Sequence, residues 1–161
     1  MIAASVQDAR RRPWSAPRAL AIGTLLVGVI DGLDAIVVFG LRGVAPGRVF
    51  QGIASGLLGR EAFQGGASTV ALGVLLHFFI AFVIVAVYFA ASRRISVLWR
   101  RPIECGLAYG VAAYFVMSQL VVPLAIGRGP FVLPLFVNGV LIHAFGVGLP
   151  AALVAARASR T

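Results

Sequence analysis

The sequence is poor in charged residues and contains no lysine. Its 161 residues include 14 basic residues, all arginine, and 5 acidic ones, so 12% of the chain is charged while 60% is hydrophobic. A typical soluble domain is about 25% charged, and a small soluble chain needs many polar groups to cover its surface. The composition therefore excludes a soluble globule, a disordered chain and a coiled coil, and it predicts an integral membrane protein.

Cysteine and recognisable catalytic motifs are also scarce. Cys105 is the single cysteine, which excludes an internal disulfide and a CxxC redox or zinc motif. The sequence has no serine nucleophile elbow, no HExxH helix and no phosphate-binding glycine loop. We therefore identify no catalytic residue and do not expect an enzyme.

The net charge of +9 does not indicate nucleic-acid binding. The arginines occur in short clusters between apolar runs, whereas a nucleic-acid surface concentrates them on one face. Clusters of this kind are typical of loops retained in the cytoplasm. The expected surroundings are a lipid bilayer, and a homo-oligomer or a larger membrane complex is compatible with the sequence.

Long apolar runs predict an all-α fold, a membrane-spanning four-helix bundle. A helix rises about 1.5 Å per residue and a bilayer core is about 30 Å thick, so each run is long enough to cross. Residues 17–156 form the single transmembrane domain, between a basic N-terminal segment (1–16) and a short tail (157–161). The predicted spans are 17–41, 67–91, 103–122, ended by Pro123, and 134–156. A cleavable signal peptide is disfavoured because the first run holds two aspartates and no cleavage site follows it.

The arginine distribution predicts the orientation. Ten arginines fall on one side of the predicted membrane (positions 10, 11, 12, 18, 93, 94, 100, 101, 157 and 160), and four on the other (42, 48, 60 and 128). The arginine-rich side is normally cytoplasmic. We therefore expect both termini in the cytoplasm of a bacterial cell, with the chain in its inner membrane.

A shorter amphipathic segment lies between the first two spans. Apolar residues recur on one helical face over residues 46–59, and Pro46 suits a first helical turn. The segment is too short to span the bilayer. It is expected to anchor in the outer interface, or to re-enter and cover a site that opens outward.

Two of the spans match one another. Residues 73–79 (GVLLHFF) and 139–145 (GVLIHAF) share five of seven positions, among them a glycine and a histidine. The match suggests two helical hairpins related by an axis along the membrane normal, although a composition this biased also produces chance matches.

Four ionisable residues lie inside the predicted spans: Asp31, Asp34, His77 and His143. Such groups are costly in lipid and should face the bundle interior. Counting residues from the span ends places all four roughly 10–15 Å below the outer surface. Polar residues that could supplement this site from the outer side are Tyr114, Ser118, Gln119 and Asn138.

Three functions are compatible with this polar group. The first is a site that handles a proton, an ion or a small ligand, with the aspartates as acids and the histidines as partners. The second is axial ligation of a haem iron, or binding of a metal, by His77 and His143. The third is an accessory subunit in which Asp–His hydrogen bonds only hold the helices together.

Two G-x-x-x-G steps predict where helices approach closely. Gly28 and Gly32 form one step, and Gly106 and Gly110 form the other. Glycines at this spacing let two helix backbones meet.

Several short stretches carry a resemblance to known proteins. They are residues 31–35 (DGLDA), 40–43 (GLRG), 53–59 (IASGLLG) and 76–78 (LHF). Over roughly residues 20–155 the chain resembles a family of small uncharacterised bacterial inner-membrane proteins. The resemblance implies a four-helix membrane fold and location, and it implies no activity or catalytic residue.

Overall fold

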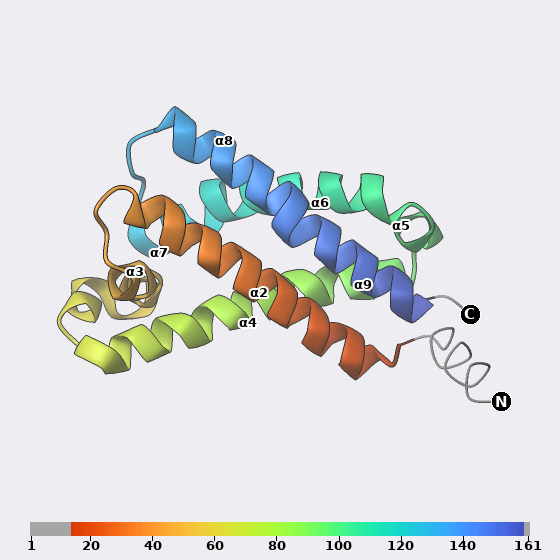
Figure 1. Ribbon diagram of the computed structural model, residues 1–161, viewed down its shortest axis with the longest axis horizontal. Coiled ribbons are helices and arrows are strands. Elements are labelled where there is room, and N and C mark those ends of the chain that lie inside the picture. Colours follow the sequence, from red (N-terminus) through yellow and green to blue (C-terminus); the bar gives the residue numbers. More distant parts are fainter. Residues whose placement is uncertain (1–13, 160–161) are drawn as a thin grey trace.

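The computed structural model describes residues 14–159, and this part of the chain is helical without strands (Figure 1). Most helices are α-helices, η1 is a 3-10 helix, and η2 and η3 are π-helical segments. In chain order they are α2 (Ala16–Gly40), α3 (Pro46–Leu58), η1 (Gly59–Phe63), α4 (Gly66–Ser92), α5 (Ser96–Arg100), α6 (Pro102–Val116), η2 (Met117–Val121), α7 (Val122–Ile126), α8 (Leu133–Ile142), η3 (His143–Gly148) and α9 (Leu149–Ser159).

Four continuous helical stretches are long and apolar enough to cross a membrane. They are Ala16–Gly40, Gly66–Ser92, Pro102–Ile126 and Leu133–Ser159. The chain is thus an all-α membrane protein with four spans, which confirms the predicted fold class. The predicted clusters at Arg10–Arg12 and Arg160 lie outside the described residues.

Two helices continue beyond the predicted span ends. The helix of the third span does not stop at Pro123 but continues to Ile126, so that predicted stop is wrong, and the helix of the last span runs on through Arg157 to Ser159. Proline lacks the N–H that would bond to a carbonyl one turn back. A π-helical segment directly precedes Pro123 (η2), and another precedes Pro150 (η3). Widened turns of this kind let a span pass through a proline without stopping.

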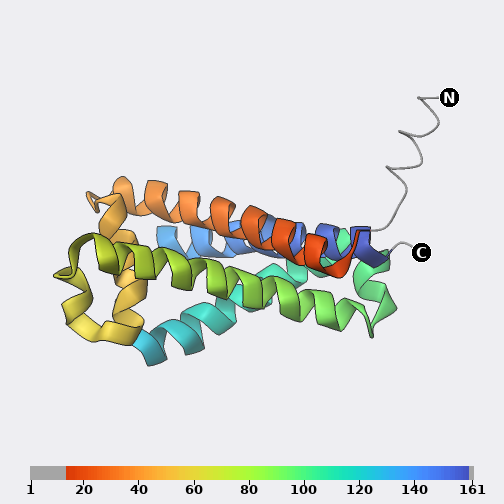
Figure 2. The same ribbon diagram turned by 90° about the horizontal axis from the view of Figure 1, so that it is seen from below.

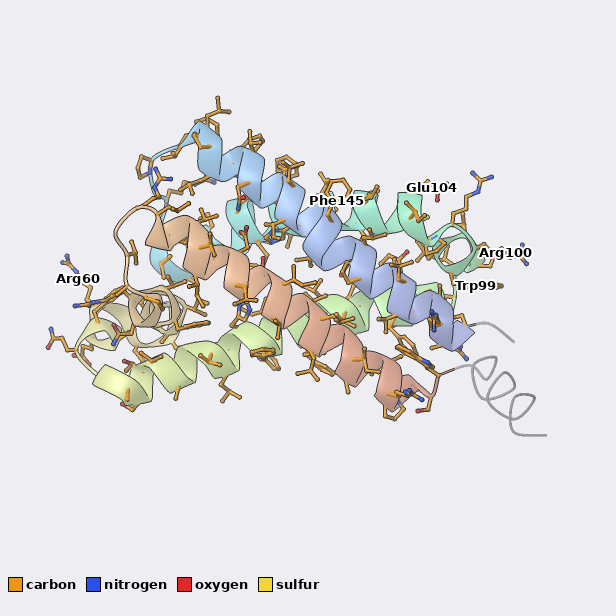
Figure 3. All side chains as sticks on the ribbon, viewed as in Figure 1. Arg60, Trp99, Arg100, Glu104 and Phe145 are labelled. Atoms are coloured by element: carbon orange, nitrogen blue, oxygen red, sulfur yellow. The ribbon has the colours of Figure 1, made fainter. Side chains whose placement is uncertain are left out.

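The spans run lengthwise, and the connections gather at the two ends (Figure 1). The start of α2 and the end of α9 lie at the same end of the bundle as α5, whereas α3 and the α7–α8 connection lie at the other end. Labelled charged side chains mark both ends in Figure 3, with Arg60 beside α3 and Arg100 and Glu104 beside α5. Phe145 lies between these ends and is largely exposed, as expected for contact with lipid.

Small residues fill the interior and large apolar residues cover the outside. Val27, Val85, Ala81 and Ala151 belong to the main buried cluster, while Leu124 is 79% and Leu75 67% exposed. In a membrane the hydrophobic effect does not separate helix surfaces from lipid, so close packing of small residues holds the bundle together. The exposed apolar surface is the surface that lipid would cover.

Helix α3 lies across the end of the bundle, as Figure 2 shows. It begins with Pro46 in its first turn and ends at Gly59, whose positive φ of 62° stops the helix. Buried Gln51 donates hydrogen bonds to the Thr69 hydroxyl (3.2 Å) and the Gly66 carbonyl (3.3 Å) at the start of α4. A side chain on Gly73 would collide with the Phe50 backbone, so α3 and α4 are in close contact.

Candidate functional site

The polar residues predicted to form a site come from four helical segments. Asp31 and Asp34 lie on α2, His77 on α4, Asn138 on α8, and His143 at the start of η3. Both aspartates and His143 are partly buried, and His77 is buried with 8% of its surface exposed. Helix α2 packs against α4, η3 and α8, so it is the element that faces every other part of the site.

Asp34 has a fixed partner on the last span. The Asn138 side chain donates a hydrogen bond from Nδ2 to Asp34 Oδ2 at 2.8 Å. This bond joins residues 104 positions apart in the sequence and links α2 to α8. Asn138 was predicted to supplement the site, and it directly contacts one of the two acids.

The His77 side chain also contacts α2, but its partner is the α2 backbone rather than a side chain. The ring Nε2 lies 2.8 Å from the Gly28 carbonyl oxygen, so we assign the proton to Nε2 because a carbonyl oxygen only accepts. Phe50 and Phe78 meet the ring edge-on, at centroid distances of 6.1 and 5.6 Å. A side chain on Gly32 would meet the same nitrogen.

The Asp–His hydrogen bonds of the accessory-subunit hypothesis do not form within residues 14–159. The reason is the packing at Gly28 and Gly32, which are buried against Phe78 and His77. Because these glycines lack side chains, α4 approaches the α2 backbone closely. The His77 ring therefore reaches a main-chain carbonyl rather than a carboxylate.

Asp31 is the acid without a fixed partner. Its carboxyl group lies close enough to His143, His77 and Asp34 to interact with each electrostatically. Within the described part of the chain, however, no side chain forms a hydrogen bond or an ion pair with it. Asp31 is thus the site's available acceptor.

His143 faces the third span. Its ring meets Tyr114 of α6 edge-on at a centroid distance of 5.4 Å. Its Nδ1 is buried and has no hydrogen-bond partner among residues 14–159. A buried unpaired ring nitrogen costs free energy, and together with Asp31 it leaves hydrogen-bonding capacity for a small ligand, a water or a proton.

Ser118 and Gln119 form no hydrogen bond with this group among residues 14–159. Gln119 is exposed, and its side chain donates to Ser118 Oγ at 3.4 Å. Asn138 and Tyr114 are the predicted supplementary residues that directly contact the site.

The structure also shows buried polar groups outside the predicted site. Thr24 Oγ1, two turns before Asp31, is buried without a partner in the described chain, and Gln51 and Thr69 form the buried contact of α3 with α4. In the sequence, the signal for the Gln51 contact is a lone amide directly after the apolar pair Val49–Phe50.

The second G-x-x-x-G step also lies at a helix contact. Gly106 faces Ala152 and Gly148, and Gly110 faces the His143 backbone. In both halves of the chain a G-x-x-x-G step therefore packs against the histidine-bearing segment of a later span. The halves differ one helical turn before each histidine, where Gly73 contacts α3 whereas Gly139 contacts the Tyr114 ring. The symmetry suggested by the internal repeat remains a prediction.

The residues present do not fit a bis-histidine haem. His77 Nε2 is already bonded to Gly28, with Gly32 against the same atom, so an iron there would require α2 and α4 to separate. Residues 14–159 also contain no cluster of three or more histidine, cysteine or acidic side chains that could hold a metal ion.

The geometry is that of a small polar centre inside an apolar bundle. One acid is held by an amide, one histidine is held by a backbone carbonyl, and one acid and one histidine remain available. Searches of family models, curated proteins and solved structures find no match for this chain.

Proposed function

We propose that this chain is a bacterial inner-membrane protein in which Asp31 gains and releases a proton, or exchanges a small cation, with His143 and His77 as its electrostatic partners. The observation that carries the proposal is the difference between the two aspartates. Asp34 accepts a hydrogen bond from Asn138, whereas Asp31 has no fixed partner among residues 14–159.

An ionisable group without a fixed partner is costly in a membrane interior. Insertion of an aspartate at the centre of a span costs about 2.5–3.5 kcal/mol. A packing role would lower this cost by giving the carboxylate a hydrogen-bond donor, as Asn138 does for Asp34. A group whose work is a change of charge must instead remain free to bind and release its ligand.

The α3 end of the bundle is the proposed side of access. Phe50 of α3 lies against the His77 ring, so the site is one layer of side chains below α3. With the arginine-rich end in the cytoplasm, α3 lies on the outer face of the membrane. The site then exchanges its proton or cation with the outer side.

Proton flux into vesicles tests this function. The purified protein is reconstituted in vesicles that contain a pH-sensitive dye, and a potassium gradient with valinomycin imposes a membrane potential. We expect flux above that of protein-free vesicles, and we expect Asp31→Asn to abolish it because an amide cannot carry the charge. Glu104→Gln, which removes an exposed carboxylate near the other end, should leave the flux unchanged.

Two results would contradict the proposal. One is flux no greater than that of protein-free vesicles under any imposed gradient of protons, sodium or potassium. The other is full flux in the Asp31→Asn variant. Thermal unfolding in detergent shows whether the variant is folded, and we expect it to unfold near the wild-type temperature.

An accessory subunit is the second candidate function. It is favoured by the two fixed contacts between spans, Asn138 to Asp34 and His77 to the Gly28 carbonyl. In such a protein the polar residues would serve packing, and a partner protein would supply the activity. This candidate predicts no flux and an unfolding temperature that falls when either contact is removed.

Haem binding is tested by a visible absorption spectrum of protein purified after expression with adequate haem. We expect no Soret band, because His77 is packed against α2. A band that is lost in His77→Ala and in His143→Ala would establish haem binding by these two histidines and contradict the expectation that they do not hold a haem.

A further inference from the structure

A second cluster of charge lies at the opposite end of the bundle from α3, around Trp14. The Arg18 guanidinium carbon lies 5.1 Å from the centre of the Trp14 ring, and that of Arg157 lies 5.7 Å from it. Arg18 is in the first turn of α2 and Arg157 is in the last turn of α9. Two cations from the first and last spans are thus held against one indole.

The packing fixes this arrangement. The Trp14 backbone N–H donates to the Arg157 backbone carbonyl at 3.2 Å, and the Trp14 side chain packs on a buried cluster of Ala19, Val154 and Ala158. Both guanidinium groups are exposed. Arg100 and Trp99 make a simpler contact at the same end of the molecule, between neighbours in one short helix. Among residues 14–159, only the Trp14 cluster draws its arginines from two spans.

Positive charge predominates among the described residues at this end, which favours the binding of an anion. The described arginines there are Arg18, Arg93, Arg94, Arg100, Arg101 and Arg157, and the one described carboxylate nearby is Glu104. Within residues 14–159 no carboxylate forms an ion pair with Arg18 or Arg157. Both guanidinium groups lie within 5.7 Å of the centre of one indole, and each is free to donate hydrogen bonds to a phosphate.

We propose that Trp14, Arg18 and Arg157 form a binding site for the phosphate headgroup of an anionic phospholipid. Trp14 lies where the first span begins, and tryptophan prefers the headgroup level of a bilayer. Lipid phosphate is the anion concentrated at that level, and arginines next to a span attract anionic lipids. The inference does not depend on the proposed function of Asp31, because the two sites lie at different levels of the bundle.

Tryptophan quenching by brominated lipid tests the site. In a Trp99→Phe background, emission comes from Trp14 alone, and a brominated lipid quenches only the indoles that it contacts. Brominated phosphatidylglycerol and brominated phosphatidylcholine are compared at equal mole fraction in otherwise identical phosphatidylcholine vesicles. We expect phosphatidylglycerol to be enriched several-fold at Trp14. The double variant Arg18→Gln/Arg157→Gln should lose this preference.

The matched control is Arg93→Gln/Arg94→Gln, which removes the same charge at the same end but leaves the Trp14 cluster intact. It should retain the preference. Equal quenching by the two lipids in the parent, or equal loss of preference in both double variants, would overturn the site. Loss of the preference on adding inorganic phosphate would assign the site to free phosphate and overturn the lipid assignment.

A second measurement covers the case in which the Trp99→Phe background does not fold. Thermal unfolding of the unmodified chain in detergent is followed with added phosphatidylglycerol or phosphatidylcholine. A ligand that binds only the folded state raises the unfolding temperature. We expect phosphatidylglycerol to raise it more than phosphatidylcholine, and an equal effect of the two lipids would overturn the proposal.

Discussion

Asp34 and Asn138 provide a measurable contact between the first and last spans. Their hydrogen bond is 2.8 Å long and partly buried. Hydrogen bonds between membrane helices contribute on average about 0.6 kcal/mol and at most about 1.7. We predict a coupling energy in this range from a double-mutant cycle with Asp34→Leu and Asn138→Leu, measured by unfolding in mixed detergent micelles. Strictly additive effects of the two substitutions would show that the contact contributes nothing.

The sequence predicts which residues are polar inside the spans, but not which atoms they contact. Asp31, Asp34, His77 and His143 stand out because ionisable groups are rare in apolar runs. The partner of His77 could not be predicted, since it is the carbonyl of Gly28 and every residue has a carbonyl. His77 contacts the Gly28 carbonyl because α4 approaches the face of α2 on which Gly28 and Gly32 carry no side chains.

At the scale of elements, Gln51 should decide how firmly α3 is held on the bundle. Its two hydrogen bonds reach the first turn of α4. We predict that Gln51→Leu speeds hydrogen exchange in α3 while exchange in the middle of α4 stays unchanged, because the buried Thr69 hydroxyl loses its donor. The control is Gln119→Leu, an exposed glutamine on the third span. Unchanged exchange in α3 would mean that apolar contacts alone hold the helix.

The space around each glycine predicts how much an alanine substitution there changes stability. A methyl group on Gly110 would collide with the His143 backbone, whereas one on Gly52 would meet nothing within 4 Å. Overpacking of this kind costs about 1–3 kcal/mol, while alanine favours a helix by up to about 1 kcal/mol over glycine. Gly110→Ala should therefore lower the unfolding temperature in detergent, and Gly52→Ala should leave it unchanged or raise it. The reverse order would contradict the placement of these helices.

The long elements are more predictable than their ends. An apolar run of about 25 residues predicts a span because its length matches the bilayer core. The stop predicted at Pro123 was wrong because the widened turns of η2 let the helix continue to Ile126. The amphipathic helix at residues 46–59 forms as Pro46–Leu58. Its position across the end of the bundle depends on Gln51 and Gly73, which one-dimensional periodicity does not reveal.

At the scale of the whole molecule, the arginine distribution makes a prediction about topology. The start of α2, the end of α9 and the α4–α6 connection lie at one end of the bundle, and the α7–α8 connection lies at the other (Figure 1). Reporter fusions truncated after Arg94 and after Arg128 should therefore report opposite sides. Because the arginine-rich side of a membrane protein normally faces the cytoplasm, we predict inside for the first and outside for the second. The same side for both, or the inverse pattern, would contradict the orientation.

The proposed function requires that the carboxyl group of Asp31 alternates between its neutral and charged forms inside the bundle. Dicyclohexylcarbodiimide is an apolar reagent to which protonated carboxyl groups in membranes add, giving a stable N-acylurea, and mass spectrometry of peptides identifies the modified residue. The measurement is the extent of modification at Asp31 and at Asp34 as a function of pH. We predict modification of Asp31 that falls as the pH rises, with Asp34 less reactive because Asn138 engages it. Absence of modification at Asp31, or modification that does not change with pH, would contradict the proposed change of charge at Asp31.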